Sequence, residues 1–498
     1  CSMKALLVLI LGLLLIVGAD TMAQTDMDLR DSIPYLLSPL PNTLDFTGGG
    51  ARSKGMGNAF IGVSDDISAV SWNPAGLYRL DTPYEQPVMA LGYNAFKSNS
   101  DYEFLAFDES FEHSESFGDI SMASFLAPVR IKGHPFVLAG SYTRLDDEYN
   151  SAEFVYDTYT DYTPLDDVTD TNLFRQIGRA GYHSAVYAIN IGFGTRVYND
   201  FTFGLAINVY DGKATRQEVY TQIFDGVSPP SLSGQSVLQV KKFVTTDTMS
   251  FSGTYFTFGM RYTGEKLSAG LTVKTPHVLK QTTDAKLATT NTLNGNVITE
   301  GTETTYWDDE LTELDMPLAI GGGIGYQVTE NLLLAMDAEY RAFSGGEINV
   351  RDSIRLNPGE EDTEFFTTTD PQWNNVLTVR AGGEYLWHTG SKIFPLVPIR
   401  AGFAYVPIPT PNVTGDIEYD TTQAAIESEP DLRTEDAAAT SFALGSGMHW
   451  NQIHLDLAYT YRKLDRENTA KIVEGSPYFQ SETSIADHLF NVTFTGFF

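Results

Sequence analysis

The sequence predicts an all-β protein: a 14-stranded antiparallel transmembrane β-barrel with an N-terminal hatch, or plug, inside the lumen. Three observations support this fold class: an export signal at one end, a strand ending in Phe at the other, and short segments of alternating hydrophobicity between them. The expected domains are a signal peptide with two extra upstream residues (1–23), an N-terminal extension with the hatch (24–86) and the barrel (87–498).

A basic start and an apolar run define the expected signal peptide. Met3-Lys4 precedes the 14 apolar residues 5–18, and small residues suited to a cleavage site follow at Thr21-Met22-Ala23. A membrane-anchoring helix is the alternative, but it needs about 20 apolar residues. We therefore expect an exported chain that begins near Gln24, and it contains no cysteine for disulfides or thiolate metal sites.

The charge is strongly acidic and unevenly distributed. A net charge of -32 argues against a nucleic-acid partner, because a phosphate-binding surface needs a basic stripe. Acidic residues concentrate in 145–181, 345–372 and 408–439, which we expect to be solvated loops. None of these stretches has the ligand spacing of a calcium loop, so the sequence predicts neither a metal site nor a cofactor.

Alternating segments with one apolar and one polar face recur along the chain, as in strands. The fourteen expected strands are 88–96, 117–128, 135–144, 182–198, 201–213, 248–263, 266–280, 317–328, 332–344, 373–388, 396–407, 440–451, 453–464 and 487–498. An even number suits a bacterial barrel, whereas a large secreted β-sandwich or solenoid is the alternative.

The connections alternate between short turns, such as 199–200, and long stretches. The long stretches, expected as loops, are 97–116, 145–181, 214–247, 281–316, 345–372, 408–439 and 465–486. Short turns face the periplasm in such barrels, so both termini are expected inside and the acidic loops outside. The last strand ends at Phe498, as is typical of outer-membrane barrels of Gram-negative bacteria, where this residue addresses the chain to the barrel-assembly machinery. We expect a monomer in contact with outer-membrane lipid.

Residues 48–77 are rich in glycine and small residues, which permits close backbone packing. The Asp65-Asp66 pair can cap a helical turn over 67–72, and Asn73-Pro74 would end it. The stretch lacks the Gly-Lys-Ser/Thr ending of a phosphate loop, so nucleotide binding is not predicted. A compact, irregular element is expected.

This stretch resembles the hatch of the FadL/TodX family of outer-membrane transporters for hydrophobic compounds. The pattern Gly-Ala-Arg-x-x-Gly-Met-Gly-x-Ala-Phe, an Asp-Asp pair and Asn-Pro-Ala-Gly all occur here. The matching residues are Gly50, Arg52, Gly55, Gly57, Phe60, Asp65, Asp66, Asn73, Pro74, Ala75 and Gly76. The sequence match covers the hatch, and the rest of the resemblance lies in the layout of the chain.

The resemblance implies passive diffusion of hydrophobic small molecules, such as long-chain fatty acids or hydrocarbons, across the outer membrane. In that family the hatch rearranges and a kinked third strand allows lateral exit. In this chain the third expected strand offers only Pro135 and Gly140 as kink points, and the long acidic stretches are less apolar than a ligand groove.

Strand parity places a set of charged residues on the lumen face. The basic ones are Arg196, Arg261, Lys274, Arg341, Arg380, Arg400 and Arg462, and the acidic ones are Asp337, Glu339, Glu384 and Asp456. Arg341, Arg380 and Arg400 are candidates to bind a ligand carboxylate through the guanidinium fork. The alternative is a set of cross-strand ion pairs, which the interleaving of the two signs favours.

Aromatic residues divide into two groups. Phe60 and Trp72 in the expected hatch are candidates for ligand contact, although packing of the plug is the default explanation for them. Trp387, Trp450, Tyr459 and Tyr461 are expected in the girdle at the membrane interface. No Gly-x-Ser-x-Gly elbow or His-Glu-x-x-His helix is present, so the sequence does not predict an enzyme, although a lipid hydrolase is a third reading.

A second function, of another class, also stays open. The chain is similar to the FadL-like PorV component of type IX secretion, a barrel that acts as an interaction subunit and binds the C-terminal signals of exported proteins. Long acidic loops suit a protein partner, because aligned charges steer association.

Overall fold

The computed structural model describes residues 48–79, 86–104, 109–162, 170–227, 236–293, 296–300, 304–354, 363–371, 373–391, 394–414, 419–420, 425–426, 433–450, 452–471 and 478–498. The expected signal peptide lies outside these ranges. No helix in the described part of the chain is long and apolar enough to cross a membrane.

Helices occur only near the start of these ranges: α2 (Ala51–Gly55), α3 (Ala69–Trp72) and the 3-10 helix η1 (Pro74–Leu77). The strands of the first half are β1 (Val88–Phe104), β2 (Glu109–Ile131), β3 (His134–Tyr162), β4 (Asp170–Tyr198), β5 (Phe201–Val227), β6 (Ser236–Thr263), β7 (Leu267–Lys274), β8 (His277–Leu293), β9 (Asn296–Glu300), β10 (Thr304–Met316) and β11 (Ala319–Thr329). Those of the second half are β12 (Leu332–Arg341), β13 (Ile348–Ile354), β14 (Thr363–Thr369), β15 (Val376–His388), β16 (Leu396–Pro407), β17 (Asn412–Thr414), β18 (Tyr419–Asp420), β19 (Ala425–Ile426), β20 (Arg433–Glu435), β21 (Ala438–His449), β22 (Ile453–Lys471) and β23 (Tyr478–Phe497).

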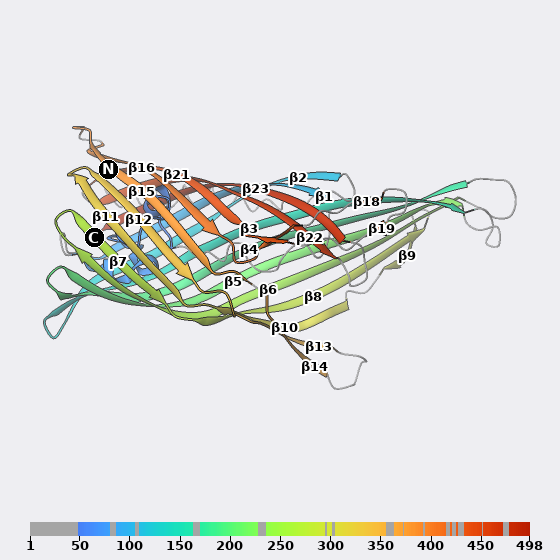
Figure 1. The fold of residues 1–498 in the computed structure, drawn as a ribbon, viewed down its shortest axis with the longest axis horizontal. Coiled ribbons are helices and arrows are strands. Elements are labelled where there is room, and N and C mark those ends of the chain that lie inside the picture. Colours follow the sequence, from blue (N-terminus) through green and yellow to red (C-terminus); the bar gives the residue numbers. More distant parts are fainter. Residues whose placement is uncertain are drawn as a thin grey trace.

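The sheet closes into a barrel, because β1 pairs along its length with both β2 and the last strand, β23. Several strands of the wall are interrupted, so that β7 with β8, β10 with β11, β12 with β13, and β14 with β15 each act as one. The wall thus has the 14 antiparallel strands that the sequence predicts, and Figure 1 shows how they surround the lumen.

Side chains alternate between the two faces of this wall as the sequence predicts. On β12 the apolar Leu334 and Met336 are exposed on the outside, whereas Asp337 and Glu339 are buried on the inside. The apolar band faces outward, where lipid replaces water, and the polar residues find partners within the lumen.

The long stretches expected as loops are in large part strands, which corrects the sequence analysis. β3 and β4 each contain 29 residues, and most of the stretch 145–181 belongs to them. A strand of that length spans about 95 Å, far more than the 9–11 residues that cross a membrane. Beyond the membrane both faces of a strand meet water, so the alternating pattern fades although the hydrogen-bond ladder continues.

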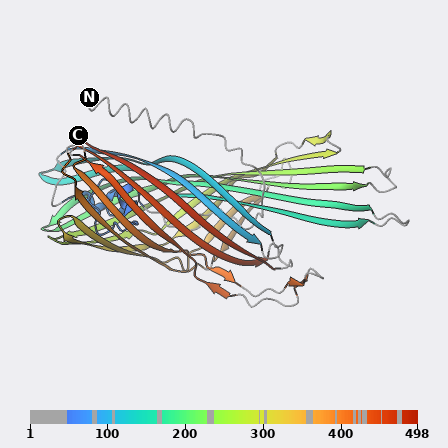
Figure 2. The same cartoon turned by 90° about the horizontal axis from the view of Figure 1, so that it is seen from above.

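At this long-strand end the wall divides into two sheets, visible in Figure 2. β2 pairs with β3 only from Met122↔Thr143 to Ile131↔His134, although both strands continue. Among the described residues, β14 pairs only with β13, and β17 pairs only with β20 and β22. We call the gap in pairing between β2 and β3 the first separation, and that between β14 and β17 the second separation.

The two possible kink points of the third strand, Pro135 and Gly140, lie in regular register. β3 pairs regularly with β2 and β4 through Pro135 and Gly140, and its register shifts instead between Arg144 and Asp146. The pairing on both sides is continuous at Gly140, whereas the shift lies just beyond the point at which β2 stops pairing.

Candidate functional site: the lumen and the N-terminal segment

Residues 48–78, the N-terminal segment, lie against the inner face of the wall. The carboxylate of Asp337 on β12 accepts the backbone N–H groups of Phe60, Ile61 (2.6 Å) and Gly62 (3.4 Å). On β23, the hydroxyl of Thr493 accepts the N–H of Ala51 at 2.9 Å. Inward side chains of the wall thus hold the segment by its backbone.

Glycines on both sides bring the two backbones together. A Cβ on Gly323 of β11 would lie 2.6 Å from the nitrogen of Gly62, and one on Gly57 would lie 2.8 Å from the carbonyl carbon of Gly402. Gly57 also has a φ of +62°, which favours glycine. The sequence analysis recognised the glycines of the segment but missed those of the wall. Their signal was glycine at inward positions of strands, where it is otherwise unfavourable.

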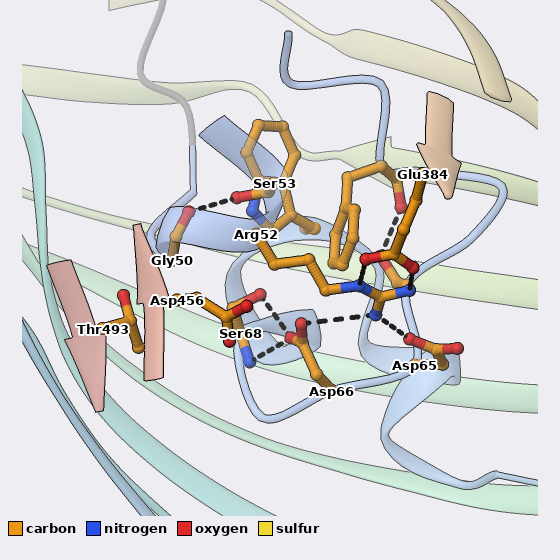
Figure 3. A network of polar contacts seen from close by, with 12 residues as sticks. Gly50, Arg52, Ser53, Asp65, Asp66, Ser68, Glu384, Asp456 and Thr493 are labelled. Carbon is orange, nitrogen blue, oxygen red and sulfur yellow. Dashed lines mark hydrogen bonds and ion pairs between the residues drawn. The ribbon is translucent and has the colours of Figure 1, made fainter. Parts of the chain in front are cut away.

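A charged network links the segment to three strands (Figure 3). Arg52 donates from Nε to Glu384 Oε2 at 3.1 Å and from Nη2 to Oε1 at 3.0 Å, and it also contacts Asp65. Glu384 of β15 accepts a second guanidinium, that of Arg400 (2.6 Å), which in turn reaches Asp456 at 2.7 Å. Each buried charge therefore faces opposite charges, as burial requires.

We expect Arg52→Lys to loosen the segment by about 1–2 kcal/mol, because an ammonium cannot reproduce the forked contact with Glu384. Hydrogen exchange of the backbone amides in residues 48–62 measures this change. Arg130→Lys, at an exposed position on β2, is the matched control. Equal exchange in the two variants would contradict the role given to the Arg52 fork.

The other motif residues shape the segment from within. The expected helical turn forms as α3 and ends at Asn73-Pro74, and the Asp66 carboxylate accepts the N–H of Ser68 at 2.9 Å before it. Asn73 donates to the carbonyl of Ile61 (3.0 Å) and accepts the N–H of Ala75 (3.2 Å). The remaining motif residues also lie in this segment and are buried: Gly50, Gly55, Pro74 and Gly76. Gly50 is the N-cap of α2 and has a φ of +101°, which favours glycine.

The residues considered for ligand contact are already engaged within the protein. Phe60 and Trp72 pack edge to face with ring centroids 6.2 Å apart, and the Trp72 indole donates to the carbonyl of Gly49 at 3.1 Å. Arg341 donates to Glu339 at 2.7 Å, and Lys274 donates to the same carboxylate. Arg341 and Arg400 therefore take part in the interleaved ion pairs.

The inward placement holds for most of the charged set. Arg261, Arg341, Arg380, Arg400, Asp337, Glu339, Glu384 and Asp456 are buried, and Lys274 and Arg462 are partly buried. The inward placement predicted for Arg196 is wrong, because this residue is exposed beside the β4–β5 turn. The register shifts between Arg196 and Tyr198, so strand parity no longer applies at that end.

A second set of inward residues is apolar and lies beyond the segment, toward the long-strand end. These buried side chains, which we call the luminal apolar cluster, come from β3 to β15 and include Leu145, Val186, Met249, Phe251, Leu314 and Trp373. The lumen thus has a charged, glycine-lined zone that holds the segment, and next to it an apolar zone.

A closed, 14-stranded antiparallel barrel with the N-terminal segment packed against its inner face defines the fold. Three solved structures share it at 14% sequence identity. The FadL homologue of Pseudomonas aeruginosa covers 90% of this chain and 98% of its own, with a TM-score of 0.51. The toluene transporter TodX of Pseudomonas putida covers 92% and 100% (TM-score 0.50), and the monoaromatic hydrocarbon channel CymD covers 91% and 98% (TM-score 0.50).

The fold implied by the FadL/TodX resemblance is thereby confirmed. Two of these neighbours are described as a toluene transporter and a monoaromatic hydrocarbon channel. No protein family and no curated protein matches this chain by sequence.

Proposed function

We propose that this protein is a passive channel for hydrophobic compounds, long-chain fatty acids or hydrocarbons, across the outer membrane of a Gram-negative bacterium. The luminal apolar cluster is the observation that carries the proposal. Water-filled barrels have a polar lumen, whereas here apolar side chains from seven or more strands gather inside the wall. Fold neighbours described as toluene and monoaromatic hydrocarbon transporters support the same substrate class.

In this proposal the N-terminal segment acts as the hatch, and the substrate leaves sideways through the first separation. Gly49 supports that route. A Cβ on it would lie 2.9 Å from Thr143 and 3.2 Å from Met122, the residues at which β2 and β3 stop pairing. The start of the segment therefore lies at the edge of the first separation, so movement of the segment and opening of the wall are linked.

Uptake of radiolabelled toluene and oleate by cells producing the protein tests the proposal. We expect Phe251→Asp to reduce uptake about tenfold or more, because the introduced carboxylate would lose its hydration when an apolar ligand occupies the cluster. Ser250→Asp is the matched control, since Ser250 is the exposed neighbour on the same strand. No uptake by the unmodified protein, or equal loss in both variants, would overturn the proposal.

The long strands favour one other candidate function, an interaction subunit of a protein-secretion system. β3 to β6 contain 27 to 29 residues each and project well past the membrane, which gives a protein partner a surface to dock on. Affinity purification from detergent extracts distinguishes the two functions. Recovery of secreted proteins, with no co-purified fatty acid or hydrocarbon in mass spectra, would favour the interaction subunit.

A further inference from the structure

The second separation coincides with a row of breaks in neighbouring strands. β7 and β8, β10 and β11, β12 and β13, β14 and β15, and β16 and β17 are separated by breaks, and each of these breaks except the one between β12 and β13 contains a proline. The prolines are Pro276, Pro317, Pro371 and Pro409. Proline cannot donate to a ladder and is therefore found at strand ends and edges. β1 to β6, in contrast, run through this level without interruption.

These breaks lie at the edge of the apolar band. Outward apolar residues of β15 extend from Trp387 to Leu377, which matches the ~25 Å band of a membrane barrel. Leu377 and, on β16, Tyr405 are the last exposed members before the breaks. The second separation therefore begins at the surface of the membrane, on the long-strand side.

The floor of the second separation is apolar. Trp373 and Phe343 are buried there and pack edge to face, with ring centroids 5.7 Å apart. Both belong to the luminal apolar cluster, and Ile408 is buried in a second apolar cluster with Ala437 on the other side. Apolar side chains thus continue from the outer surface at Leu377 to the lumen.

The first separation has a different floor. Asp119 of β2 accepts Arg144 of β3 at 2.6 Å and the hydroxyl of Tyr187 of β4 at 2.7 Å. The first separation therefore has a more polar floor than the second separation.

Two asparagines connect neighbouring breaks, and Asn374 does so across the second separation. Asn374 donates its backbone N–H to the carbonyl of Pro409 (2.8 Å) and its side-chain amide to Asp436 (2.9 Å). Asn375 accepts the N–H of Ser344 at 2.9 Å. Among the described residues these are local polar bonds, in place of the continuous ladder that joins the other strands. A few exposed hydrogen bonds are weak, at about 1 kcal/mol each.

We infer that the second separation is a side entrance, through which apolar molecules pass from the outer surface of the membrane over Trp373 to the luminal apolar cluster. Asn374 holds it at its present width. This inference rests on the proposed function. In it the apolar ligand enters through the second separation and leaves through the first separation. The ligand class is that of small, uncharged, apolar molecules that partition into the bilayer.

The test links the two sides of the second separation covalently. In a Cys1→Ser background, Asn374→Cys and Asp436→Cys are joined by a short bis-methanethiosulfonate reagent. The matched control is Lys213→Cys with Ser250→Cys, an exposed pair directly opposite on the unbroken β5 and β6. Heat-modifiable migration in gels verifies that each barrel is folded before and after linkage.

We expect linkage of 374 to 436 to reduce toluene uptake about tenfold and reduction of the linker to restore it, whereas the control pair leaves uptake unchanged. A second measurement does not depend on transport: photolabelling with 3-trifluoromethyl-3-phenyldiazirine, mapped by mass spectrometry. Label on Trp373 or Phe343 that disappears on linkage supports the side entrance even in a protein that fails to transport. Unchanged labelling on linkage, or unchanged uptake by a linked and transporting protein, overturns it.

Discussion

Asp337→Ala is expected to release the middle of the N-terminal segment from the wall. The Asp337 carboxylate accepts the N–H groups of three consecutive residues, Phe60 to Gly62, from a position on β12 that is 1% exposed. Hydrogen bonds to a charged acceptor contribute about 1.5–3 kcal/mol each. Even if water replaces some of these hydrogen bonds, opening of the segment should become roughly a hundredfold more frequent.

Hydrogen exchange of the amides of residues 60–62 measures that opening, and single-channel conductance in planar bilayers shows whether ions then pass. Asp211→Ala, at an exposed position on β5, is the control for loss of a carboxylate. Unchanged protection of these amides in Asp337→Ala would mean that other contacts suffice to hold the segment.

Gly323→Val is expected to displace the same part of the segment by steric exclusion. The added Cβ would clash with Oδ1 of Asp337, which holds the segment, and would lie 2.6 Å from the backbone nitrogen of Gly62, which cannot rotate aside. Overpacking of an ordinary core costs about 1–3 kcal/mol, and a backbone-to-backbone contact should cost more than that. We expect lost protection of residues 57–63 and a lower unfolding temperature.

The neighbouring residue provides an unusually close control. A Cβ on Gly322 would meet nothing nearer than 3.9 Å, because this glycine lies on the opposite face of β11. Gly322→Val should therefore leave segment protection unchanged, and valine also suits a strand better than glycine. Equal behaviour of the two variants would show that the close approach at Gly323 does not position the segment.

The barrel itself could be predicted from sequence because its cause is local. A strand with lipid on one side and a wet lumen on the other must alternate, as in 396–407, which coincides with β16. The alternation of apolar and polar residues no longer identifies strands beyond the membrane-spanning part of the wall. Along β3 and β4 the residues beyond the membrane have water on both sides, so strand and loop look alike in composition.

The site was predictable only in part, for a similar reason. Strand parity placed Glu384, Arg400 and Asp456 inside, and their opposite charges suggested ion pairs, but parity cannot reveal that Arg52 from a distant segment joins them. The sequence analysis also missed the hydrogen bonds of Asn374 across the second separation. Asn374 belongs to no recognisable sequence motif, and its partners depend on which strand breaks lie side by side in the fold.

The glycine contacts between the segment and the wall have a consequence for how such barrels diverge. Contacts made backbone to backbone depend on shape alone, so each half constrains the other at matched positions such as Gly57 with Gly402. Exchanging this segment for that of a distant homologue should fail unless the recipient's inward glycines are moved with it. The segment and the inward glycines of the wall therefore have to be exchanged together.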